Sequence, residues 1–469
     1  MRFGTSGVRG LVAEMTDPVC EAWVRGFLRH LRAESVPLSE VLVGRDRRPS
    51  SPRIAAACAA AAASEGLIAL DAGVVPTPAL ALAAAARGVP AVMVTGSHIP
   101  FDRNGLKFFR PEGEITKADE EGIAAARPGA VALPRALPRP VAVAVEAPYA
   151  ARCVDFFAVG CLEGLRVGVF QHSAAGRDLL VSVLDRLGAE AVPLGASEEF
   201  TPIDTEAVAP DVARRVAAWV GDLGLDALVS TDGDGDRPLV ADETGAVLRG
   251  DALGILAARF LGADAVAAPV NVSGALERSG WFGRVRRTRI GSPFVVEAAA
   301  TLAAGAALAV GFEANGGFLL AGTAEREGRR LSPLPTRDAL VPMLAVLSEV
   351  RRRGEPLSAL VASLPARATA SARLEQVPEA DSLHLIARLD ASEGARAALA
   401  REVAGAGIVA IDRTDGLRMT LASGEILHLR ASGNAPELRC YAEAGTAAAA
   451  EALAAALADR VARMVAERA

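Results

Sequence analysis

Three aspartates at alternate positions, Asp232, Asp234 and Asp236, form the strongest candidate for a chemical site in this sequence. The glycines between them, Gly233 and Gly235, have no Cβ and allow the chain to fold tightly around a bound ion. Ligands that offer only oxygen atoms favour Mg²⁺ or Ca²⁺ over zinc. Because three adjacent carboxylates repel one another without a counter-charge, we expect a divalent cation at this loop.

The calcium loop of an EF-hand is an alternative for the same stretch. Asp232, Asp234, Asp236 and Glu243 match four ligand positions of that loop. Its sixth position requires glycine, whereas this chain has Arg237, and the flanking residues are typical of strands and not of helices. The sequence therefore argues against an EF-hand.

A second candidate is a serine that directly follows a predicted strand. Ser97 has a glycine before it, which exposes its hydroxyl, and His98 and Lys107 are near enough to donate or accept protons or to hold a phosphate. The nucleophile elbow of serine hydrolases needs glycine two residues before and after the serine, but Thr95 and Ile99 stand there. This loop therefore does not predict a hydrolase, and an ordinary Gly-Ser turn remains an equal alternative.

A turn near the C-terminus combines arginines with small polar residues. Arg430 and Arg439 bracket the turn residues Ser432, Gly433 and Asn434. Side chains and backbone N–H groups of this kind can hold a phosphate dianion. A surface turn with solvated arginines fits the same stretch equally well.

Two weaker signals complete the candidate site. Glu313 and Asn315 lie two residues apart among glycines, which suits contacts with neighbouring hydroxyls of a sugar, although a tight glycine turn is an equal alternative. Arg9 follows a glycine-rich segment that could bind phosphate. A glycine-rich loop alone is weak evidence for such binding.

The elements that must position these residues alternate between strand and helix. Alternation of this period predicts doubly wound, mostly parallel sheets. Ligands of open α/β sheets bind beyond the carboxyl ends of strands, and three candidate loops follow strand ends, so three α/β units are expected to face one site. The predicted strands are residues 41–44, 67–70, 91–94, 165–170, 227–230 and 307–310.

The last part of the chain has a different pattern. Short strands are predicted at residues 408–411, 417–421 and 425–429, with turn signals between them and an alanine-rich helix from Thr446. This part is therefore expected to be α+β. Breaks near a proline-rich stretch, a Gly-Asp pair and a Leu-Pro pair divide the chain into four expected domains, residues 1–137, 138–249, 250–364 and 365–469.

The composition excludes several classes of protein. With 50 Lys and Arg against 56 Asp and Glu, the net charge is −6, which argues against a non-specific nucleic-acid binder. The longest uncharged apolar run, residues 298–312, is too short to cross about 30 Å of hydrocarbon. Five scattered cysteines without a CxxC pair and a start without an apolar leader predict a cytoplasmic protein without a membrane span.

Taken in order, these motifs resemble those of the α-D-phosphohexomutase family, which includes phosphomannomutases and phosphoglucomutases. The likeness runs from Phe3 to Glu443. It implies three α/β domains and a C-terminal α+β domain around a central cleft. It also implies a phosphoserine at Ser97 and a Mg²⁺ ion held by that residue with the three aspartates of residues 232–236.

The resemblance assigns the remaining candidates as well. Arg9 and Arg237 would steady the phosphate and substrate, and His98 and Lys107 would transfer protons. The residues expected to bind substrate are Glu313, Asn315, Arg430, Ser432, Gly433, Asn434 and Arg439.

The reaction implied by the resemblance moves a phosphoryl group reversibly between C1 and C6 of a hexose phosphate. Phosphoserine gives its phosphoryl group to the sugar, and hexose 1,6-bisphosphate is the bound intermediate and activator. The motifs are most similar to those of enzymes for mannose phosphate, with glucose and glucosamine phosphates as alternatives. A metal-dependent sugar-phosphate binding protein without turnover is less consistent with a chain that keeps Ser97, and a monomer and a dimer are both compatible with the sequence.

The chain departs from the family pattern in three places. Ile99 replaces the asparagine of the usual Ser-His-Asn-Pro segment, and Asn434-Ala435 replaces Thr-Glu in the phosphate turn. Ser292 follows a glycine where the family often has a basic residue. Arg289 is close enough in sequence to substitute for that residue.

Overall fold

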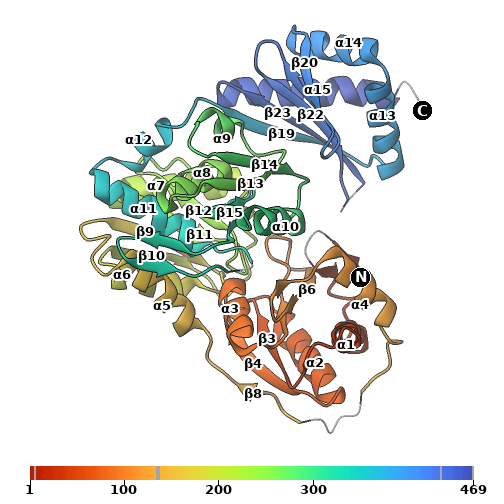
Figure 1. The fold of residues 1–469 in the computed structure, drawn as a ribbon, viewed down its shortest axis with the longest axis vertical. Coiled ribbons are helices and arrows are strands. Elements are labelled where there is room, and N and C mark those ends of the chain that lie inside the picture. Colours follow the sequence, from red (N-terminus) through yellow and green to blue (C-terminus); the bar gives the residue numbers. More distant parts are fainter. Residues whose placement is uncertain (5–6, 134–137, 335, 434–435, 467–469) are drawn as a thin grey trace.

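The computed structural model describes residues 1–4, 7–133, 138–334, 336–433 and 436–466. Its four larger sheets follow one another along the molecule, with the N-terminal sheet at one end and the C-terminal sheet at the other (Figure 1). Among the described residues, no helix is both long enough and apolar enough to cross a bilayer. The expected class, three α/β units with mixed sheets and an α+β unit, is confirmed.

The first sheet has eight strands in the order β1-β2-β6-β5-β3-β4-β8, with β7 paired to β6. Its centre is parallel, and the edge from β5 to β1 is antiparallel. The strands are β1 (Arg2–Phe3), β2 (Val8–Leu11), β3 (Glu40–Arg45), β4 (Ile68–Val74), β5 (Ala91–Val94), β6 (Arg103–Arg110), β7 (Gly113–Glu114) and β8 (Val141–Ala142).

Helices cover both faces of this sheet because neighbouring strand residues point to opposite sides. Phe108 packs in the core beneath α1 (Asp17–Ala33) and α2 (Ser51–Ser64), whereas Phe109 packs with residues of α3 (Thr77–Arg87). The helix α4 (Lys117–Ala126) packs against α1. Strand β8 pairs with β4, so the first sheet extends past residue 137, where the first domain boundary was expected.

The second and third sheets repeat one design. Each has three parallel strands and one antiparallel strand at an edge, in the orders β10-β9-β11-β12 and β14-β13-β15-β16. The strands are β9 (Arg166–His172), β10 (Glu190–Ala196), β11 (Ala227–Thr231), β12 (Pro238–Ala241), β13 (Ala265–Pro269), β14 (Arg284–Thr288), β15 (Ala309–Phe312) and β16 (Phe318–Leu320). The strand expected at residues 307–310 lies two residues later, as β15.

One apolar core joins these two units. Val229 of the second sheet and Phe312 of the third belong to the same cluster of buried side chains, together with Leu344. The helices that contribute to this core are α5 (Glu146–Phe157), α6 (Arg177–Arg186), α8 (Gly250–Leu261), α9 (Ala275–Arg278), α11 (Leu340–Arg353) and α12 (Leu357–Ala362), beside a small hairpin of β17 (Ala324–Arg326) and β18 (Arg329–Leu331). Two further helices, α7 (Pro210–Leu223) and α10 (Ser292–Ala303), pack in separate clusters on the second and third sheets. The second and third units therefore form one packed body.

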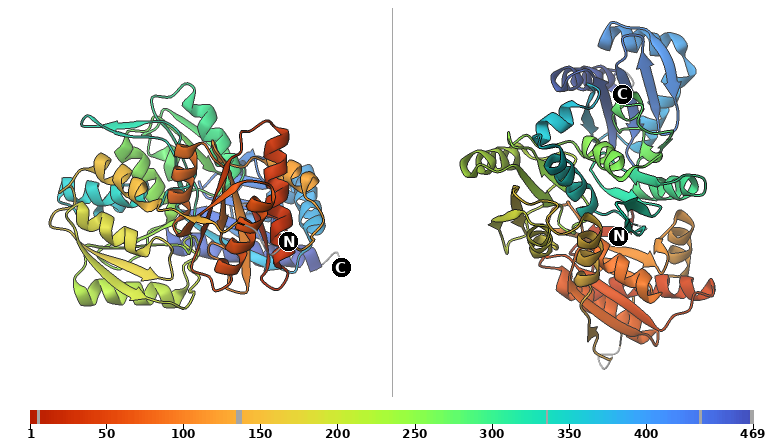
Figure 2. Two further views of the ribbon diagram at one scale, coloured as in Figure 1. Left: turned by 90° about the horizontal axis from the view of Figure 1, so that it is seen from below. Right: turned by 60° about the vertical axis from the view of Figure 1, so that its left-hand side comes forward.

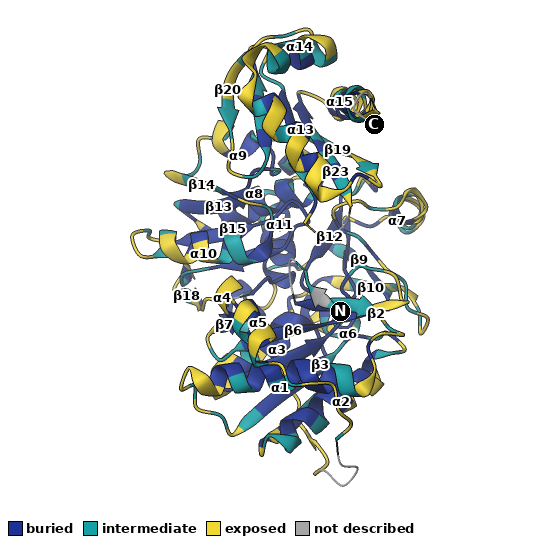
Figure 3. Ribbon diagram, turned by 90° about the vertical axis from the view of Figure 1, so that its right-hand side faces the viewer, coloured by how far each residue is buried: buried dark blue, intermediate teal, exposed yellow. Residues whose placement is uncertain are grey.

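The C-terminal unit has a core of its own. Its five strands run antiparallel in the order β19-β23-β22-β21-β20, and its buried residues form a separate cluster (Figures 2 and 3). The elements are β19 (Ala368–Glu375), α13 (Glu379–Ala391), α14 (Glu393–Ala404), β20 (Ile408–Asp412), β21 (Leu417–Leu421), β22 (Ile426–Ala431), β23 (Glu437–Ala444) and α15 (Ala447–Ala466). A core of its own makes this unit a separate domain.

Candidate active site

The three loops with the strongest motifs occupy equivalent places in the three α/β sheets. Each joins a parallel strand to an antiparallel return strand: residues 95–102 join β5 to β6, residues 232–237 join β11 to β12, and residues 313–317 join β15 to β16. The loops lie at the carboxyl ends of parallel strands, where α/β proteins bind ligands.

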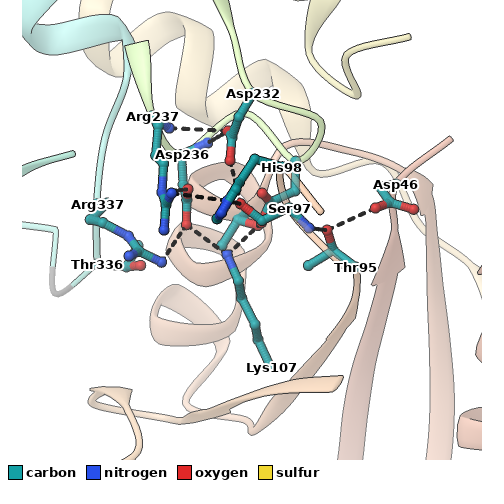
Figure 4. A network of polar contacts seen from close by, with 12 residues as sticks. Asp46, Thr95, Ser97, His98, Lys107, Asp232, Asp236, Arg237, Thr336 and Arg337 are labelled. Carbon is teal, nitrogen blue, oxygen red and sulfur yellow. Dashed lines mark hydrogen bonds and ion pairs between the residues drawn. The ribbon is translucent and has the colours of Figure 1, made fainter. Parts of the chain in front are cut away.

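The loop of Ser97 has a fixed and unusual backbone. Ser97 has a φ of 55°, a left-handed value that is uncommon for a residue other than glycine. Its N–H donates to Thr95 Oγ1 at 2.8 Å, and that hydroxyl donates to Asp46 Oδ2 at 2.8 Å (Figure 4). Strain of this kind persists only where neighbouring contacts enforce it, and it often marks a functional residue.

Arg48 supports this loop from beneath and was not among the predicted site residues. Its Nη2 donates to the carbonyls of Ser97 at 3.0 Å and Ile99 at 2.6 Å, and its side chain is fully buried. A Cβ on Gly96 would lie 2.6 Å from Arg48 Cζ, so only glycine fits there. Asp46 pairs with Arg48 at 3.1 Å and balances its charge.

The three aspartates converge as predicted. Ligand oxygens of Asp232, Asp234 and Asp236 all lie within 4.8 Å of one another, and the three residues are buried. Ser97 Oγ donates a hydrogen bond to Asp232 Oδ2. A Cβ on Gly233 would lie 2.8 Å from the Ser97 carbonyl oxygen, so the serine loop and the aspartate loop are in direct contact.

The aspartate oxygens fit a divalent cation. Asp234 Oδ1 and Asp236 Oδ1 are buried and have no hydrogen-bond partner. Asp232 Oδ1, in contrast, accepts the N–H groups of Asp236 at 3.2 Å and Arg237 at 3.3 Å. Buried carboxylate oxygens without partners are costly, and a hard cation would satisfy both.

Lys107, on β6, neutralises part of this negative charge. Its Nζ donates to Asp234 Oδ2 at 2.5 Å and to Asp236 Oδ2 at 2.7 Å. Burial alone would lower the pKa of Lys107, but the two aspartates outweigh that effect and raise it. Burial and the charges of its two neighbours raise the pKa of Asp232 well above its usual value. Lys107 therefore compensates the charges of Asp234 and Asp236, whereas Asp232 has no ion pair with it.

His98 is held as a neutral imidazole. Its Nδ1 lies 3.0 Å from Arg237 Nη1 and 3.3 Å from Ser97 Oγ. Burial, with the charges of Arg237 and Arg9, lowers the pKa of His98 to about 2. Because the arginine can only donate, His98 Nδ1 is the acceptor and Nε2 carries the hydrogen.

Arg9 comes from a different element of the same unit. It lies on β2, and burial with the charge of Arg237 lowers its pKa to about 10. The aspartates at 234 and 236 act on it in the opposite direction, which places this guanidinium in the field of the aspartate cluster. The structure thus brings Ser97, His98, Lys107 and Arg237 into contact with one another or with the aspartates, and it places Arg9 on β2 of the same unit as Ser97.

Arg337 is a site residue that sequence reasoning missed. Its Nη2 donates to Asp236 Oδ2 at 2.7 Å and its Nη1 to Glu313 Oε2 at 3.2 Å, with 3 % of the side chain exposed. It therefore links the aspartate loop to the predicted sugar-binding loop. A Cβ on Gly317 would lie 2.5 Å from Arg337 Cδ, so a glycine in the sugar-binding loop makes room for this arginine.

A cleft of about 220 Å³ connects this cluster to the C-terminal unit. His98, Arg237 and Arg337 line one side, and Arg430 and Arg439 line the other. Three further predicted residues, Glu313, Asn315 and Ser432, also line it. Gly433 is exposed, and Asn434 lies outside the described residues.

Comparison with known families decides the assignment. Models of the phosphoglucomutase/phosphomannomutase domains match residues 1–128 (alpha/beta/alpha domain I), 148–245 (domain II), 249–368 (domain III) and 374–460 (C-terminal domain). Together these matches cover most of the chain.

The chain belongs to the phosphoglucomutase/phosphomannomutase family.

Relatives within this family are similar over nearly their full lengths. A phosphomannomutase of Salmonella muenchen is 45% identical over 444 residues, covering 95% of this chain and 92% of the relative. A phosphomannomutase of Sinorhizobium fredii (strain NBRC 101917 / NGR234) is 43% identical over 466 residues, covering 96% of both chains. A solved structure of a phosphoglucomutase/phosphomannomutase family protein from Burkholderia thailandensis has the same fold, with a TM-score of 0.76 at 22% identity, covering 98% of this chain and 96% of that one.

One departure from the family pattern has a structural explanation. Ser292, where the family often has a basic residue, donates its hydroxyl to Glu114 Oε2 at 3.1 Å. Thr336 Oγ1 donates to the other oxygen of Glu114 at 2.7 Å, so Glu114 connects the first unit to the third. The guanidinium of Arg289 lies over the ring of Phe294 at 4.8 Å. Ser292 therefore has a role in domain contact, and Arg289 is not among the described residues that line the cleft.

Proposed function

We propose that the protein catalyses reversible phosphoryl transfer between C1 and C6 of a hexose phosphate, through a phosphoserine at Ser97 and a bound hexose 1,6-bisphosphate. The observation that carries this proposal is the hydrogen bond from Ser97 Oγ to Asp232, at the centre of a buried three-carboxylate cluster. The cations Lys107, Arg237 and Arg337 surround the same cluster. A serine in this setting suits the transfer of a dianionic phosphoryl group.

The metal of this site is proposed to be Mg²⁺, held by Asp232, Asp234, Asp236 and an oxygen of the phosphorylated Ser97. All of these ligands are oxygen, which is the donor set that Mg²⁺ prefers. Once bound, the ion would neutralise charge on the oxygens of the transferring phosphoryl group. The buried Oδ1 atoms of Asp234 and Asp236, which accept no hydrogen bond, support this assignment.

The transfer itself can be written from the residues present. A free sugar hydroxyl attacks the phosphorus of phosphoserine, a new P–O bond forms to the sugar, and the bond from phosphorus to Ser97 Oγ breaks. The proton of the hydroxyl leaves to a base, and Ser97 Oγ regains a proton when its alkoxide departs. In the second half, the other phosphate of the bisphosphate returns to Ser97 by the reverse of these steps. The protein contributes mainly position and charge to such a transition state.

Two residues remain candidates for the proton steps. Lys107 stays protonated between two carboxylates, so we infer that it acts as a proton donor. His98 is neutral, and its Nδ1 lies 3.3 Å from Ser97 Oγ. A phosphoserine dianion at this distance would raise the low pKa of His98 and bring it closer to that of an effective base.

The other end of the substrate is proposed to bind in the C-terminal unit. Arg430 and Arg439 are directly opposite each other on β22 and β23, so their side chains share one face of the sheet and line the cleft. With Ser432, Gly433 and Asn434 they would hold the phosphate that is not reacting. Glu313 and Asn315 would contact the sugar hydroxyls between the two phosphates.

Mannose phosphate is the proposed substrate because the two relatives at 43% and 45% identity are named phosphomannomutases. Glucose and glucosamine phosphates differ from it at C2 and remain the alternatives. A binding protein without turnover is disfavoured because Ser97, Lys107 and the three aspartates all lie together. The remaining domain boundaries, the cytoplasmic location and the choice between monomer and dimer stay predictions.

A coupled assay tests this function. Mannose, glucose and glucosamine 1-phosphates are each supplied with Mg²⁺ and a catalytic amount of hexose 1,6-bisphosphate, and formation of the 6-phosphate is followed. We expect turnover of all or some of the three, with the highest kcat/KM for mannose 1-phosphate. Preference for another hexose would correct the substrate, and absence of turnover with all three would refute the mutase.

A further inference from the structure

Asp415 connects the phosphate-binding face of the C-terminal unit to the third unit. It lies in the turn between β20 and β21, and its Oδ2 accepts two hydrogen bonds. One comes from Arg430 Nε at 2.7 Å, and the other comes from the N–H of Ile290 in the third unit at 2.9 Å. A single carboxylate oxygen thus joins a proposed substrate-binding arginine to the opposite wall of the cleft.

The turn that carries Asp415 is itself held in place. His428 Nε2 lies 2.6 Å from the Asp415 carbonyl oxygen, and burial lowers the pKa of His428 to about 4. The neutral ring therefore donates from Nε2, and it also stacks on Tyr441 with centroids 5.1 Å apart. Gly416 has a φ of 86°, and a Cβ there would lie 2.2 Å from a backbone oxygen, so the turn requires glycine.

The direction of the contact leaves the far end of Arg430 clear of Asp415. The carboxylate meets Nε, on the side of the guanidinium, so it does not engage the two Nη nitrogens. A guanidinium fixed through Nε loses less rotational freedom when Nη atoms bind phosphate. Arg430 lines the cleft together with Arg439, and Ile290 lines the cleft from the other side.

We propose that Asp415 is a positioning residue, which orients Arg430 toward the phosphate of the substrate and docks the C-terminal unit on the third unit through the N–H of Ile290. This inference rests on the proposed function, because it takes Arg430 to bind the phosphate that is not reacting. The ligand is the phosphate group of a hexose phosphate. Asp415 itself does not touch the substrate.

A second contact between the same two units provides a matched control. The N–H of Gly274 donates to Glu443 Oε2 at 2.9 Å, and Glu443 is buried on β23. Glu443 is not among the residues that line the cleft. Removing its carboxylate weakens the contact between the units without releasing Arg430.

The experiment measures binding in the absence of turnover. Mannose 1-phosphate is titrated calorimetrically into the full chain carrying Ser97→Ala, alone and combined with Asp415→Ala, Asp415→Asn or Glu443→Ala. Melting curves confirm that each variant is folded. Small-angle scattering of the same four proteins, with and without the sugar phosphate, reports how closely the units dock.

Asp415→Ala is expected to raise the Kd about tenfold, as for loss of one charge-assisted contact, and to increase the radius of gyration. Asp415→Asn keeps an acceptor oxygen and should raise the Kd less. Glu443→Ala should change the Kd less than threefold. If Asp415→Ala bound like its parent, or no worse than Glu443→Ala, the positioning role would be refuted.

The same data separate this inference from the proposed function. If the Ser97→Ala parent did not bind any hexose phosphate, the proposed substrate would fail, whereas the scattering comparison would still test the docking contact. An unliganded Asp415→Ala protein as compact as its parent would then overturn the inference.

Discussion

Ser97 donates a hydrogen bond from its hydroxyl to the carboxylate of Asp232, a residue 135 positions further along the chain and in another unit. This contact joins the proposed phosphoryl carrier to the proposed metal site. It exists because two strand-to-strand loops meet face to face, with Gly233 leaving room for the Ser97 carbonyl. The reacting centre is therefore assembled by the packing of the first unit against the second.

Loss of one carboxylate should weaken the metal site. Asp234→Asn removes a full charge and a ligand atom, so Mg²⁺ affinity and turnover should fall together by at least about tenfold. Calorimetric titration measures the Mg²⁺ affinity, and the coupled assay measures turnover. Asp178→Asn is a suitable control because that carboxylate is 72% exposed and lies outside the cluster. Unchanged Mg²⁺ affinity in Asp234→Asn would show that the metal binds elsewhere.

For turnover, the two hydrogen-bonding nitrogens of the Arg337 guanidinium should be more important than its positive charge. Arg337→Lys keeps the charge, but a single ammonium is a poor substitute for two nitrogens that reach Asp236 and Glu313 at once. We expect kcat/KM to fall about 10- to 100-fold, as for loss of one charge-assisted contact. Arg326→Lys, whose guanidinium donates to the Phe260 carbonyl away from the cleft, should retain normal kinetics. Normal kinetics in Arg337→Lys would show that bridging the two loops is dispensable.

Arginines that are cross-strand neighbours in the C-terminal sheet should contribute very differently to hexose phosphate binding. Arg373, Arg439 and Arg430 lie opposite one another on neighbouring strands, but Arg373 is exposed and pairs with Glu375. Arg430→Ala should weaken hexose phosphate binding about 10- to 150-fold, the range for a charge-assisted contact. Arg373→Ala should change it little. Equal effects of the two substitutions on Kd would mean that only the general positive field matters.

The free energy of unfolding should decrease as the pH is lowered, partly because of His172. Burial lowers the pKa of His172 to about 4, whereas the unfolded chain has a value near 6.5. The folded state thus binds fewer protons, and this contribution to stability is present above pH 6.5 and is lost as the pH falls toward 4. Between pH 7 and pH 5 the loss is about 2 kcal/mol, or roughly 4–8 °C in the melting temperature of the packed body that the second and third units form together.

A substitution isolates the His172 effect. His172→Gln retains a donor for the Thr231 carbonyl, which His172 Nε2 contacts at 2.8 Å, but it cannot be protonated. Its melting temperature should therefore change less between pH 7 and pH 5 than that of the wild type. His384→Gln, at an exposed position of α13, should keep the wild-type difference. An unchanged pH difference in His172→Gln would contradict the assignment.

The sequence predicts those site residues that can be recognised by their type and spacing. The alternating aspartates and Ser97 follow strand ends, and the structure brings them together with Lys107 and Arg237. The hydroxyl of Ser97 was expected to be exposed, but the residue is buried because the aspartate loop packs against it. Strand patterns were also reliable where apolar runs were short and bounded, as at Ala91–Val94.

Other parts of the site could not be read from the sequence, because their function depends on contacts distant along the chain. Arg48 lies in a polar stretch that is typical of an exposed loop. In the structure, however, its guanidinium is buried and donates hydrogen bonds to four backbone carbonyls and to Asp46. Arg337 has no motif around it, and its partners are 101 and 24 residues away. Asp415 has only the signal of an Asp-Gly turn.

The central claim is that Ser97 carries the transferred phosphoryl group, and intact-mass analysis tests it most directly. Wild-type protein and Ser97→Ala are each incubated with hexose 1,6-bisphosphate and Mg²⁺. After removal of the ligand, the intact mass of each protein is measured by mass spectrometry. We predict one added phosphoryl group on the wild type, none on Ser97→Ala, and loss of the added mass from the wild type when excess hexose monophosphate follows. An equal adduct on Ser97→Ala, or a wild type that remains unmodified while turning over substrate, would contradict the account.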